Sequence, residues 1–482
     1  MFKKTLSLLI IALIVFSGYL AFRTMTAPDK QSKINALPAP ALSDSALLHF
    51  QEAIRYKTIS FGDTSRWDSV PFIQFRQFLE KTYPLVHLQL SREIVGGYSL
   101  VYEWKGKNPS LKPFILMAHQ DVVPIEEGTE KMWTVDPFAG TIKDDYIWGR
   151  GTTDDKINLI SIMESAEKLL RTGYQPERTV YFIFGHDEEL SGQQGAVQIA
   201  ALFQTRNIKA DIIIDEGGFV TREKVPGMSQ PIALIATAEK GYMTLELSVS
   251  KSGGHSSMPE AETALDILTK AIVRLRSTPF EARFVEATKD FISYLGPSMK
   301  FPNNMAMANP DIFQSLIVKN YEKSGSGNAM IRTTAVPTIL HSGVKENVIP
   351  TLATATVNFR LLPGDSGVFI IRKVKEIIND PRVVIKVKND RIIEGSPTAS
   401  ADGIGFKRVD SIIKSSYDSV LSTPFLLIGA TDSRYFYNIS DNIIKFSPME
   451  DPIGFHGIDE RVSLKSFRHA MWFFEQFLLS AK

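Results

Sequence analysis

Short apolar runs alternate with amphipathic segments through the first half of the chain. Continuous apolar runs, which are typical of strands buried on both faces, lie at 114–118, 179–184 and 210–214. Segments whose apolar positions repeat with the period of a helix lie at 46–56, 71–82, 156–170 and 195–203. Strands that alternate with helices in this way predict an α/β domain with a mainly parallel sheet and helices on both faces.

The pattern changes near residue 240. Apolar and polar residues alternate over 242–250 and 351–361, as expected for antiparallel strands with one covered face. Two further helical segments and a last strand lie at 262–276, 369–378 and 382–388. The resulting order is strand, helix, two strands, helix, strand, which predicts a small ferredoxin-like α+β domain inserted into the first. Residues 279–331 are a long addition within it, for which we predict no structure.

The N-terminus carries an uncharged apolar run at 5–22, preceded by Lys3 and Lys4 and followed by Arg23. Its length and its flanking lysines favour an uncleaved signal anchor, with the rest of the chain outside the cytoplasm, in the periplasm or the extracellular space. The alternative is a cleaved signal peptide and a secreted protein. A linker with Pro38 and Pro40 follows the run.

These patterns divide the chain into five parts. We expect an anchor or signal segment at 1–27, a linker at 28–44, the first part of the α/β domain at 45–240, the inserted domain at 241–392 and the second part of the α/β domain at 393–482.

Composition narrows the chemistry. The 482 residues include 54 Lys and Arg against 53 Asp and Glu, a net charge of +1, which argues against a nucleic-acid partner. Cysteine is absent from the sequence, which excludes disulfides, thiolate nucleophiles, cysteine-ligated zinc and iron–sulfur clusters. Any metal must therefore be held by carboxylates and by the eight histidines.

Acidic residues and histidines follow each of the three buried strands. His119 and Asp121 come after the first, Glu188 and Glu189 after the second, and Asp215 and Glu216 after the third. Each group alone has an ordinary interpretation, such as a solvated loop. Because ligands bind beyond the carboxyl ends of parallel strands, the repetition favours one site.

Two more candidates come from a turn and from the C-terminal part. Asp154 and Asp155 follow a Gly-rich turn and precede a helix, where one Asp could act as an N-cap, and His456 lies in the second part of the α/β domain. The ligand set that emerges is His119, Asp154, Glu189, Asp215 and His456. Nitrogen and oxygen donors suit zinc, and also manganese or cobalt. Five ligands are too many for one open zinc, so Asp154 would bridge two ions.

Six separated motifs resemble, in order, those of the co-catalytic di-zinc exopeptidases and amidohydrolases, the family of aminoacylase, acetylornithine deacetylase and carboxypeptidase S. They are His-x-Asp at 119–121, Gly-Arg-Gly-x-x-Asp-Asp-Lys at 149–156, Gly-His-Asp-Glu-Glu at 185–189, Gly-Gly-His-Ser-Ser at 253–257, Asn-Val-Ile-Pro at 347–350 and His-Gly at 456–457. The resemblance covers nearly everything from residue 45 onward. Asp-Glu-Gly-Gly at 215–218, the long addition and the anchor look most like the carboxypeptidase S branch, which includes N-fatty-acyl-amino-acid hydrolases and synthases.

The resemblance implies a zinc-exopeptidase catalytic domain with a mixed, mainly parallel sheet, an inserted ferredoxin-like lid and two Zn²⁺ per chain, replaceable by Co²⁺ or Mn²⁺. Glu188 is then the general base and Glu189 a terminal ligand, while Asp121 orients His119 and Asp154 bridges the ions. The third carboxylate ligand maps to Asp215 or Glu216, and we favour Asp215.

The resemblance also assigns residues of the inserted lid. His255 resembles a residue that stabilises the oxyanion, sometimes across a homodimer formed through the lid. Asn347 and Arg360 resemble substrate-binding residues. Arg360 could grip a free carboxylate with both arms of its guanidinium, although from its position alone it is an ordinary arginine at a strand end.

We therefore predict a membrane-anchored metallohydrolase. It would cleave the amide bond before the C-terminal amino acid of a peptide, or that of an N-acyl amino acid, in a reaction that could also run in reverse. The alternatives are an aminopeptidase or dipeptidase of the same fold, and a binding protein that keeps the metals without turnover.

Overall fold

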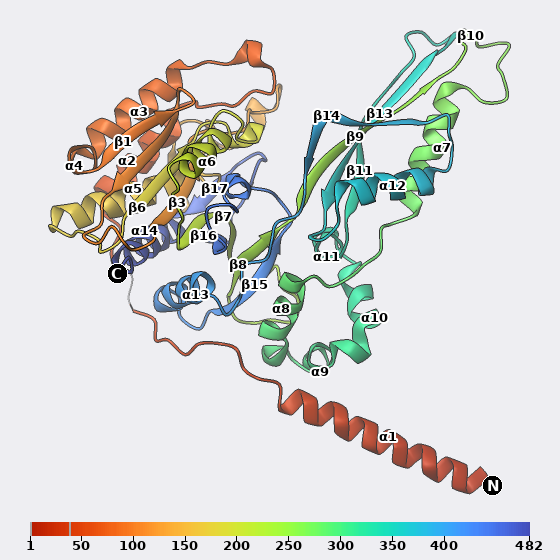
Figure 1. Ribbon diagram of the computed structural model, residues 1–482, viewed down its shortest axis with the longest axis horizontal. Coiled ribbons are helices and arrows are strands. Elements are labelled where there is room, and N and C mark those ends of the chain that lie inside the picture. Colours follow the sequence, from red (N-terminus) through yellow and green to blue (C-terminus); the bar gives the residue numbers. More distant parts are fainter. Residues whose placement is uncertain (1, 38–39) are drawn as a thin grey trace.

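Two large sheets of different construction organise residues 2–37 and 40–482, the part of the chain that the computed structural model describes (Figure 1). Pro38, in the predicted linker, lies outside the described residues. The five-part division of the chain stays a prediction.

The larger sheet has eight strands in the order β1-β2-β6-β3-β7-β16-β8-β15. The three predicted buried strands are β3 (Phe114–His119), β6 (Val180–Gly185) and β7 (Ile212–Thr221), and β3 pairs in parallel with both of the others. The remaining strands are β1 (Ser91–Val95), β2 (Ser99–Trp104), β8 (Ile232–Glu239), β15 (Leu421–Leu427) and β16 (Ile443–Glu450). Some pairs are antiparallel, such as β1 with β2 and β2 with β6, so the sheet is mixed.

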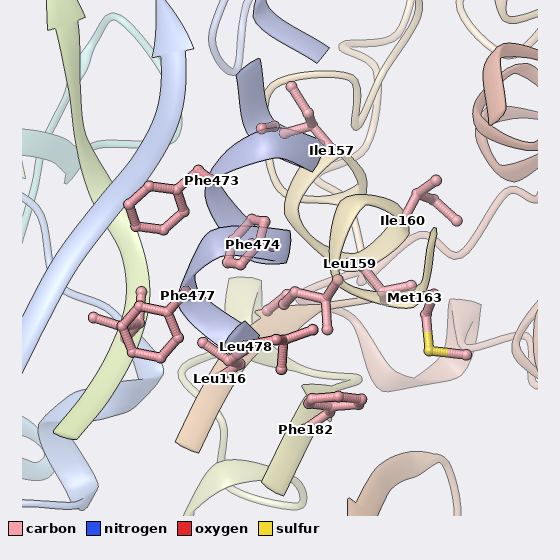
Figure 2. Close-up of a cluster of buried hydrophobic side chains, with 14 of the residues drawn as sticks. Leu116, Ile157, Leu159, Ile160, Met163, Phe182, Phe473, Phe474, Phe477 and Leu478 are labelled. Carbon is pink, nitrogen blue, oxygen red and sulfur yellow. The ribbon is translucent and has the colours of Figure 1, made fainter. Parts of the chain in front are cut away.

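Helices cover both faces of this sheet, as the continuous apolar runs predict. Leu116 and Phe182 point to the face that α5 (Lys156–Arg171) and α14 (Leu464–Leu479) cover, and a cluster of aromatic and aliphatic side chains fills this layer (Figure 2). Ile115 and Ile183 point to the opposite face, where α6 (Ala196–Thr205) packs. The helices α2 (Asp44–Arg55), α3 (Val70–Thr82), α4 (Pro84–Gln89) and α13 (Ile404–Ser416) add to the first layer.

The second large sheet is antiparallel, in the order β11-β13-β9-β14. Its strands are β9 (Gly241–Ser250), β11 (Thr334–Ser342), β13 (Leu352–Leu361) and β14 (Val384–Ile393). The helices α7 (Ala264–Ser277) and α12 (Gly367–Ile378) share a separate apolar core with them. These elements follow the predicted order along the chain.

Two small sheets complete the strands. One pairs β10 (Gly254–His255) with β12 (Val348–Ile349), and the other joins β4 (Thr141–Lys143), β5 (Tyr146–Trp148) and β17 (Arg461–Ser463).

The long addition is helical. It forms α8 (Glu286–Leu295), α9 (Asn303–Ala308), α10 (Pro310–Tyr321) and α11 (Gly325–Ile331). We call residues 286–331 the helical insert. It lies next to one end of α1 (Phe2–Met25), the one helix among the described residues that is long and apolar enough to cross a membrane (Figure 1).

Candidate metal centre

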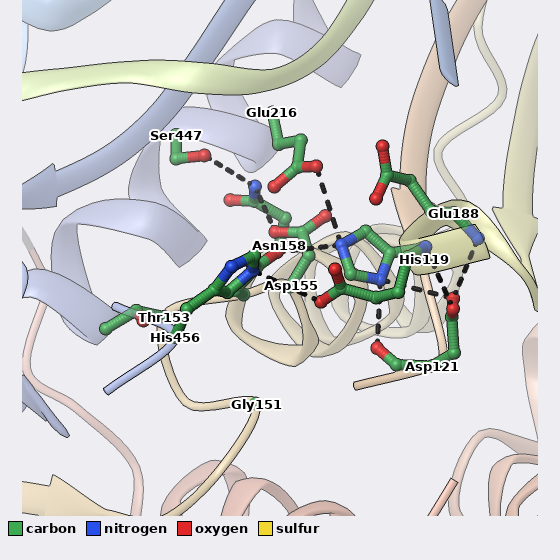
Figure 3. Close-up of polar contacts among 12 residues, drawn as sticks. His119, Asp121, Gly151, Thr153, Asp155, Asn158, Glu188, Glu216, Ser447 and His456 are labelled. Atoms are coloured by element: carbon green, nitrogen blue, oxygen red, sulfur yellow. Dashed lines mark hydrogen bonds and ion pairs between the residues drawn. The ribbon is translucent and has the colours of Figure 1, made fainter. Parts of the chain in front are cut away.

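Four of the five predicted ligands meet at the carboxyl edge of β3, β6 and β7 (Figure 3). His119 is the last residue of β3, and Glu189 lies in a short 3₁₀ helix, Glu188–Leu190, just after β6. Asp154 lies in the turn before α5, and His456 lies in the loop between β16 and β17. These four segments are far apart in sequence but place their side chains around one point, because parallel strands end at the same edge of the sheet.

Asp154 stands between the two histidines. Its Oδ1 lies 2.8 Å from Nε2 of His119, and its Oδ2 lies 2.7 Å from Nε2 of His456. One carboxylate that offers a separate oxygen to each imidazole is the arrangement expected of a bridging ligand. The His456–Asp154 contact also raises the pKa of His456 to about 10.

A second carboxylate flanks each histidine. Glu216 Oε1 lies 3.5 Å from Nε2 of His119, and Glu189 Oε1 lies 3.4 Å from Nε2 of His456. Two groups of ligand atoms result, His119 with Asp154 and Glu216, and His456 with Asp154 and Glu189. Within each group, every pair of ligand atoms lies within 4.8 Å.

Asp215, which the sequence analysis favours as a ligand, belongs to neither group among the described residues. Its Oδ2 accepts a hydrogen bond of 2.8 Å from the backbone N–H of Ser433, and its Oδ1 accepts one of 3.0 Å from that of Glu216. Neighbouring side chains on a strand point to opposite faces, so only one of the pair can face the centre. The geometry therefore favours Glu216 over Asp215 as the third carboxylate ligand.

Asp121 links two parts of the centre. His119 Nδ1 lies 2.9 Å from the backbone oxygen of Asp121 and 3.4 Å from its carboxylate. That carboxylate accepts the hydroxyl of Ser60 at 2.7 Å and the backbone N–H groups of Glu188 and Glu189 at 3.2 and 3.1 Å. Hydrogen bonds outweigh burial and lower the pKa of Asp121, so its carboxylate stays ionised between the ring of His119 and the loop that carries Glu188 and Glu189.

Glu460 is a residue of the centre that the sequence analysis missed. Its buried carboxylate accepts the backbone N–H groups of Gly151 and Thr153 at 3.0 and 2.9 Å and pairs with Arg150 at 2.6 Å. It thereby joins the turn that carries Asp154 to the loop that carries His456. Glu460 could have been recognised from the sequence because it lies four residues after His456 in the same polar loop.

Burial and mutual repulsion leave Glu216 and Glu189 hard to ionise without cations. Burial, with nearby Asp154, raises the pKa of Glu216 to about 8 and that of Glu189 to about 7. Glu189 Oε1 is buried and accepts no hydrogen bond. A buried, unsatisfied anionic oxygen is costly unless a cation compensates it, so the site fits metal ions.

Glu188 differs from its neighbour. Its side chain makes no hydrogen bond or ion pair with the described residues and points toward the centre beside Glu216 (Figure 3). Burial, reinforced by Glu216, raises the pKa of Glu188 well above the ordinary value. A carboxyl group without a partner of its own is free to take up and release a proton.

Two arginines lie near Glu188, and the sequence analysis predicted one of them. Arg360, at the end of β13, stacks on the ring of Tyr242 at 5.0 Å. Arg434 lies in the 3₁₀ helix Asp432–Tyr435, and its buried Nε has no acceptor. Neither guanidinium makes an ion pair with a described residue, although the charge of Glu188 acts on both. The short polar run around Arg434, just after β15, is the signal that was missed.

The structure keeps two predicted residues away from the centre within the same chain. His255 belongs to β10, at the far tip of the second sheet in Figure 1, and its Nδ1 lies 2.8 Å from Oγ of Ser257. Asn347 precedes β12, the partner of β10, and its backbone oxygen accepts the N–H of Ser256.

Comparisons with known proteins agree with this geometry. Residues 115–480 match the model of peptidase family M20/M25/M40. The chain is 40% identical over 470 residues to "Probable carboxypeptidase S-like 2" of Dictyostelium discoideum, covering 94% of this chain and 90% of that relative. It is 37% identical over 440 residues to the human "N-fatty-acyl-amino acid synthase/hydrolase PM20D1", covering 89% and 86%.

Solved structures share the fold. An M20 family metallo-carboxypeptidase from Sulfolobus solfataricus superposes with a TM-score of 0.67 at 18% identity, covering 90% of this chain and 99% of that one. Human carnosine dipeptidase 1 gives 0.60 at 14% identity, covering 91% and 97%. With the relatives and the family match, these findings show that the chain belongs to peptidase family M20/M25/M40 and is an enzyme of the metallopeptidase class.

Proposed function

We propose that this enzyme is a two-metal amide hydrolase whose substrates carry a free carboxylate. One substrate class is peptides, from which the enzyme would remove the C-terminal residue. The other is N-acyl amino acids, whose amide bond it would cleave. The observation that carries the proposal is the carboxylate of Asp154, which reaches both histidines at 2.8 and 2.7 Å beside the unpaired Glu188. The names of the relatives, a carboxypeptidase S-like protein and an N-fatty-acyl-amino acid synthase/hydrolase, support the two substrate classes.

The ligand atoms fit two divalent cations. His119, Asp154 and Glu216 would hold one, and His456, Asp154 and Glu189 the other. Their nitrogen and oxygen donors suit zinc, and also cobalt or manganese. When bound, such ions supply Lewis-acid polarisation of a scissile carbonyl and a water of lowered pKa.

Glu188 would move the proton. As the oxygen of the attacking water bonds to the carbonyl carbon, Glu188 takes the water's proton, and it gives that proton to the departing nitrogen when the C–N bond breaks. Its freedom from hydrogen bonds lets the carboxyl group serve both steps. This freedom also supports turnover over the alternative of a metal-containing binding protein.

The unpaired arginines support recognition of a carboxylate. A partly buried guanidinium without an acceptor is costly, and a substrate carboxylate would satisfy it with charge-assisted hydrogen bonds. Arg360 and Arg434 could act together on one carboxylate. An aminopeptidase would instead need an acidic group free to hold an α-amine. The positive charges of Arg360 and Arg434 therefore favour the carboxypeptidase and aminoacylase alternatives.

The second sheet would act as a lid and as a dimer contact. His255 and Asn347 lie together at its tip, away from the centre of their own chain. We infer that they act on the centre of a second copy, which a homodimer formed through this domain would bring into reach.

The N-terminal helix would anchor the enzyme, with its catalytic part outside the cytoplasm. Of the residues in α1 only Leu20 is buried, so this helix is not part of the protein core. A cleaved signal peptide remains the alternative.

The substrate class is tested with matched acids and amides. The full chain, purified in detergent and loaded with zinc, is offered dipeptides, N-acyl amino acids of graded chain length and the carboxamide of each. We expect the acids to be cleaved and the amides to be poor substrates. Equal cleavage of both forms would refute carboxylate recognition.

The arginines have their own test. Arg434→Ala or Arg360→Ala should lower kcat/KM on the acids at least thirty-fold or so, because truncating one partner of a desolvated ion pair costs about 2–5 kcal/mol. The amides should be affected far less. Arg372→Ala, an exposed site on α12, is the control and should change neither value. An equal loss on acids and amides would make the arginines structural.

A further inference from the structure

We propose that the helical insert rests on the bilayer surface, with α10 as its main lipid contact. The proposal rests on the membrane anchor proposed above. The surface of the insert has no role in the metal centre. Its partner would be a lipid leaflet with anionic headgroups.

The first argument is the depth at which α1 meets the insert. Leu20, the one buried residue of α1, belongs to the apolar run 5–22 that an anchor places in the hydrocarbon. Just beyond it, Thr24 Oγ1 accepts a hydrogen bond from Asn309, and Arg23 pairs with Asp311 at 2.9 Å. The start of α10 is therefore held at the edge of the membrane-spanning segment.

The second argument is the apolar surface of the insert. Leu316 in α10 is 58% exposed, Phe301 just before α9 is 75% exposed, and Ile312 is also exposed. Ile317, the neighbour of Leu316, is buried inside the insert. Ile317 is thus already covered by protein, whereas the exposed apolar side chains would gain from insertion at a lipid interface.

The third argument is charge. Lys300, Lys319 and Lys323 of this segment form no ion pair with a described residue. Between residues 300 and 323 the two acidic residues are both paired, Asp311 with Arg23 and Glu322 with Arg332. Unpaired lysines beside exposed apolar side chains are the pattern of an interfacial helix, and they attract anionic headgroups.

The fourth argument is that the segment after α1 is hydrogen-bonded to the enzyme body. Directly after α1, the side chain of Gln31 donates hydrogen bonds to the backbone oxygens of Tyr294 in α8 and Ser422 in β15, at 3.2 and 2.9 Å. Its Oε1 accepts the N–H of Ser422. Docking of the insert would therefore fix the catalytic sheet relative to the bilayer.

The absence of cysteine from the sequence makes a direct test possible. Leu316→Cys in the full chain carries an environment-sensitive fluorophore, and the protein is reconstituted in vesicles of phosphatidylcholine and phosphatidylglycerol. Leu48→Cys is the matched control, because Leu48 also lies on a helix and is 63% exposed, but on the far side of the molecule from α1 (Figure 1). Ile11→Cys, in the middle of α1, reports on the anchor.

Lipids with a nitroxide at different depths then quench the labels. We expect nitroxides located about 5–10 Å below the headgroup boundary to quench the label at Leu316. The label at Leu48 should not be quenched, and the label at Ile11 should be quenched by nitroxides deep in the bilayer. Quenching at Ile11 without quenching at Leu316 would refute the docked insert and leave the anchor intact. Lack of quenching at Ile11 would overturn the anchor and the docking together. A Leu316 label that is shielded from water but not quenched by lipid would show a protein contact and refute the proposal.

Discussion

At the residue scale, neighbouring acidic side chains differ in role because the backbone aims them differently. Glu189 lies 3.4 Å from His456, whereas Glu188 next to it makes no ion pair with a described residue. Asp215 is held by backbone N–H groups, whereas Glu216 approaches His119. The proposed function depends on these two distinctions.

The distinction between Asp215 and Glu216 is testable by metal content. Glu216→Gln removes a charged ligand from the group around His119, so we expect the variant to retain about one metal ion where the wild type retains two. Asp215→Asn, the matched control, should retain both ions. Elemental analysis after dialysis measures the difference, and loss of an ion from Asp215→Asn alone would restore Asp215 as the ligand.

The identity of the residues near the centre could be predicted from the sequence, but the direction in which each side chain points could not. His119, Asp154 and Glu189 could be recognised because each lies at a predicted strand end or after a Gly-rich turn, and His456 because it lies in the His-Gly motif at 456–457. The choice between Asp215 and Glu216 depends on which face of β7 turns inward. On its own side of β7, Asp215 accepts the N–H of Ser433, which is 218 residues away in sequence, and no local pattern reports that contact.

At the element scale, a buried carboxylate connects the two loops that carry Asp154 and His456. The turn 149–154 and the loop 454–460 carry Asp154 and His456, and the carboxylate of Glu460 binds both the N–H groups and the arginine of that turn. Arg150 and Glu460 are both buried, at 3% and 0% exposure. Neither loop has an apolar face of its own that would hold it in place.

Glu460→Gln should therefore destabilise the fold and lower activity together. Removing one charge of a buried pair costs about 3–5 kcal/mol because the other charge is left uncompensated. Glu475→Gln breaks the pair with Lys168, whose side chain is about half exposed, and should cost at most about 1 kcal/mol. Urea unfolding measures both, and equal costs for the two variants would contradict this role of Glu460.

Elements were predictable where their apolar pattern was uninterrupted. β3 and β6 were predicted for that reason. In β16 the apolar pattern is interrupted by Lys445, which is nevertheless fully buried and donates a hydrogen bond to the hydroxyl of Tyr437. β15 lies at the edge of the sheet and contains Pro424, and a proline within an apolar run argues against a central strand. In the helical insert, α9 has six residues, too few to show a helical period.

At the scale of the whole molecule, the second sheet separates His255 from the metal centre of its own chain (Figure 1). If a second copy receives this histidine, two inactive variants should rescue each other. His255→Ala and Glu188→Gln would each be inactive alone, but a mixed dimer pairs an intact Glu188 with an intact His255 at one of its two centres. Activity regained on mixing and re-equilibrating the two variants is expected, and no regain would contradict the shared site.

The most direct test of the central claim is one preparation of Glu188→Gln, measured for both activity and metal content. The amide keeps the shape of the side chain but cannot take the water's proton. We predict that kcat falls by about 10²–10⁴-fold or more, while the metal content stays at that of the wild type, because Glu188 belongs to neither group of ligands. Near-normal turnover, or loss of a metal ion from the variant, would contradict the account.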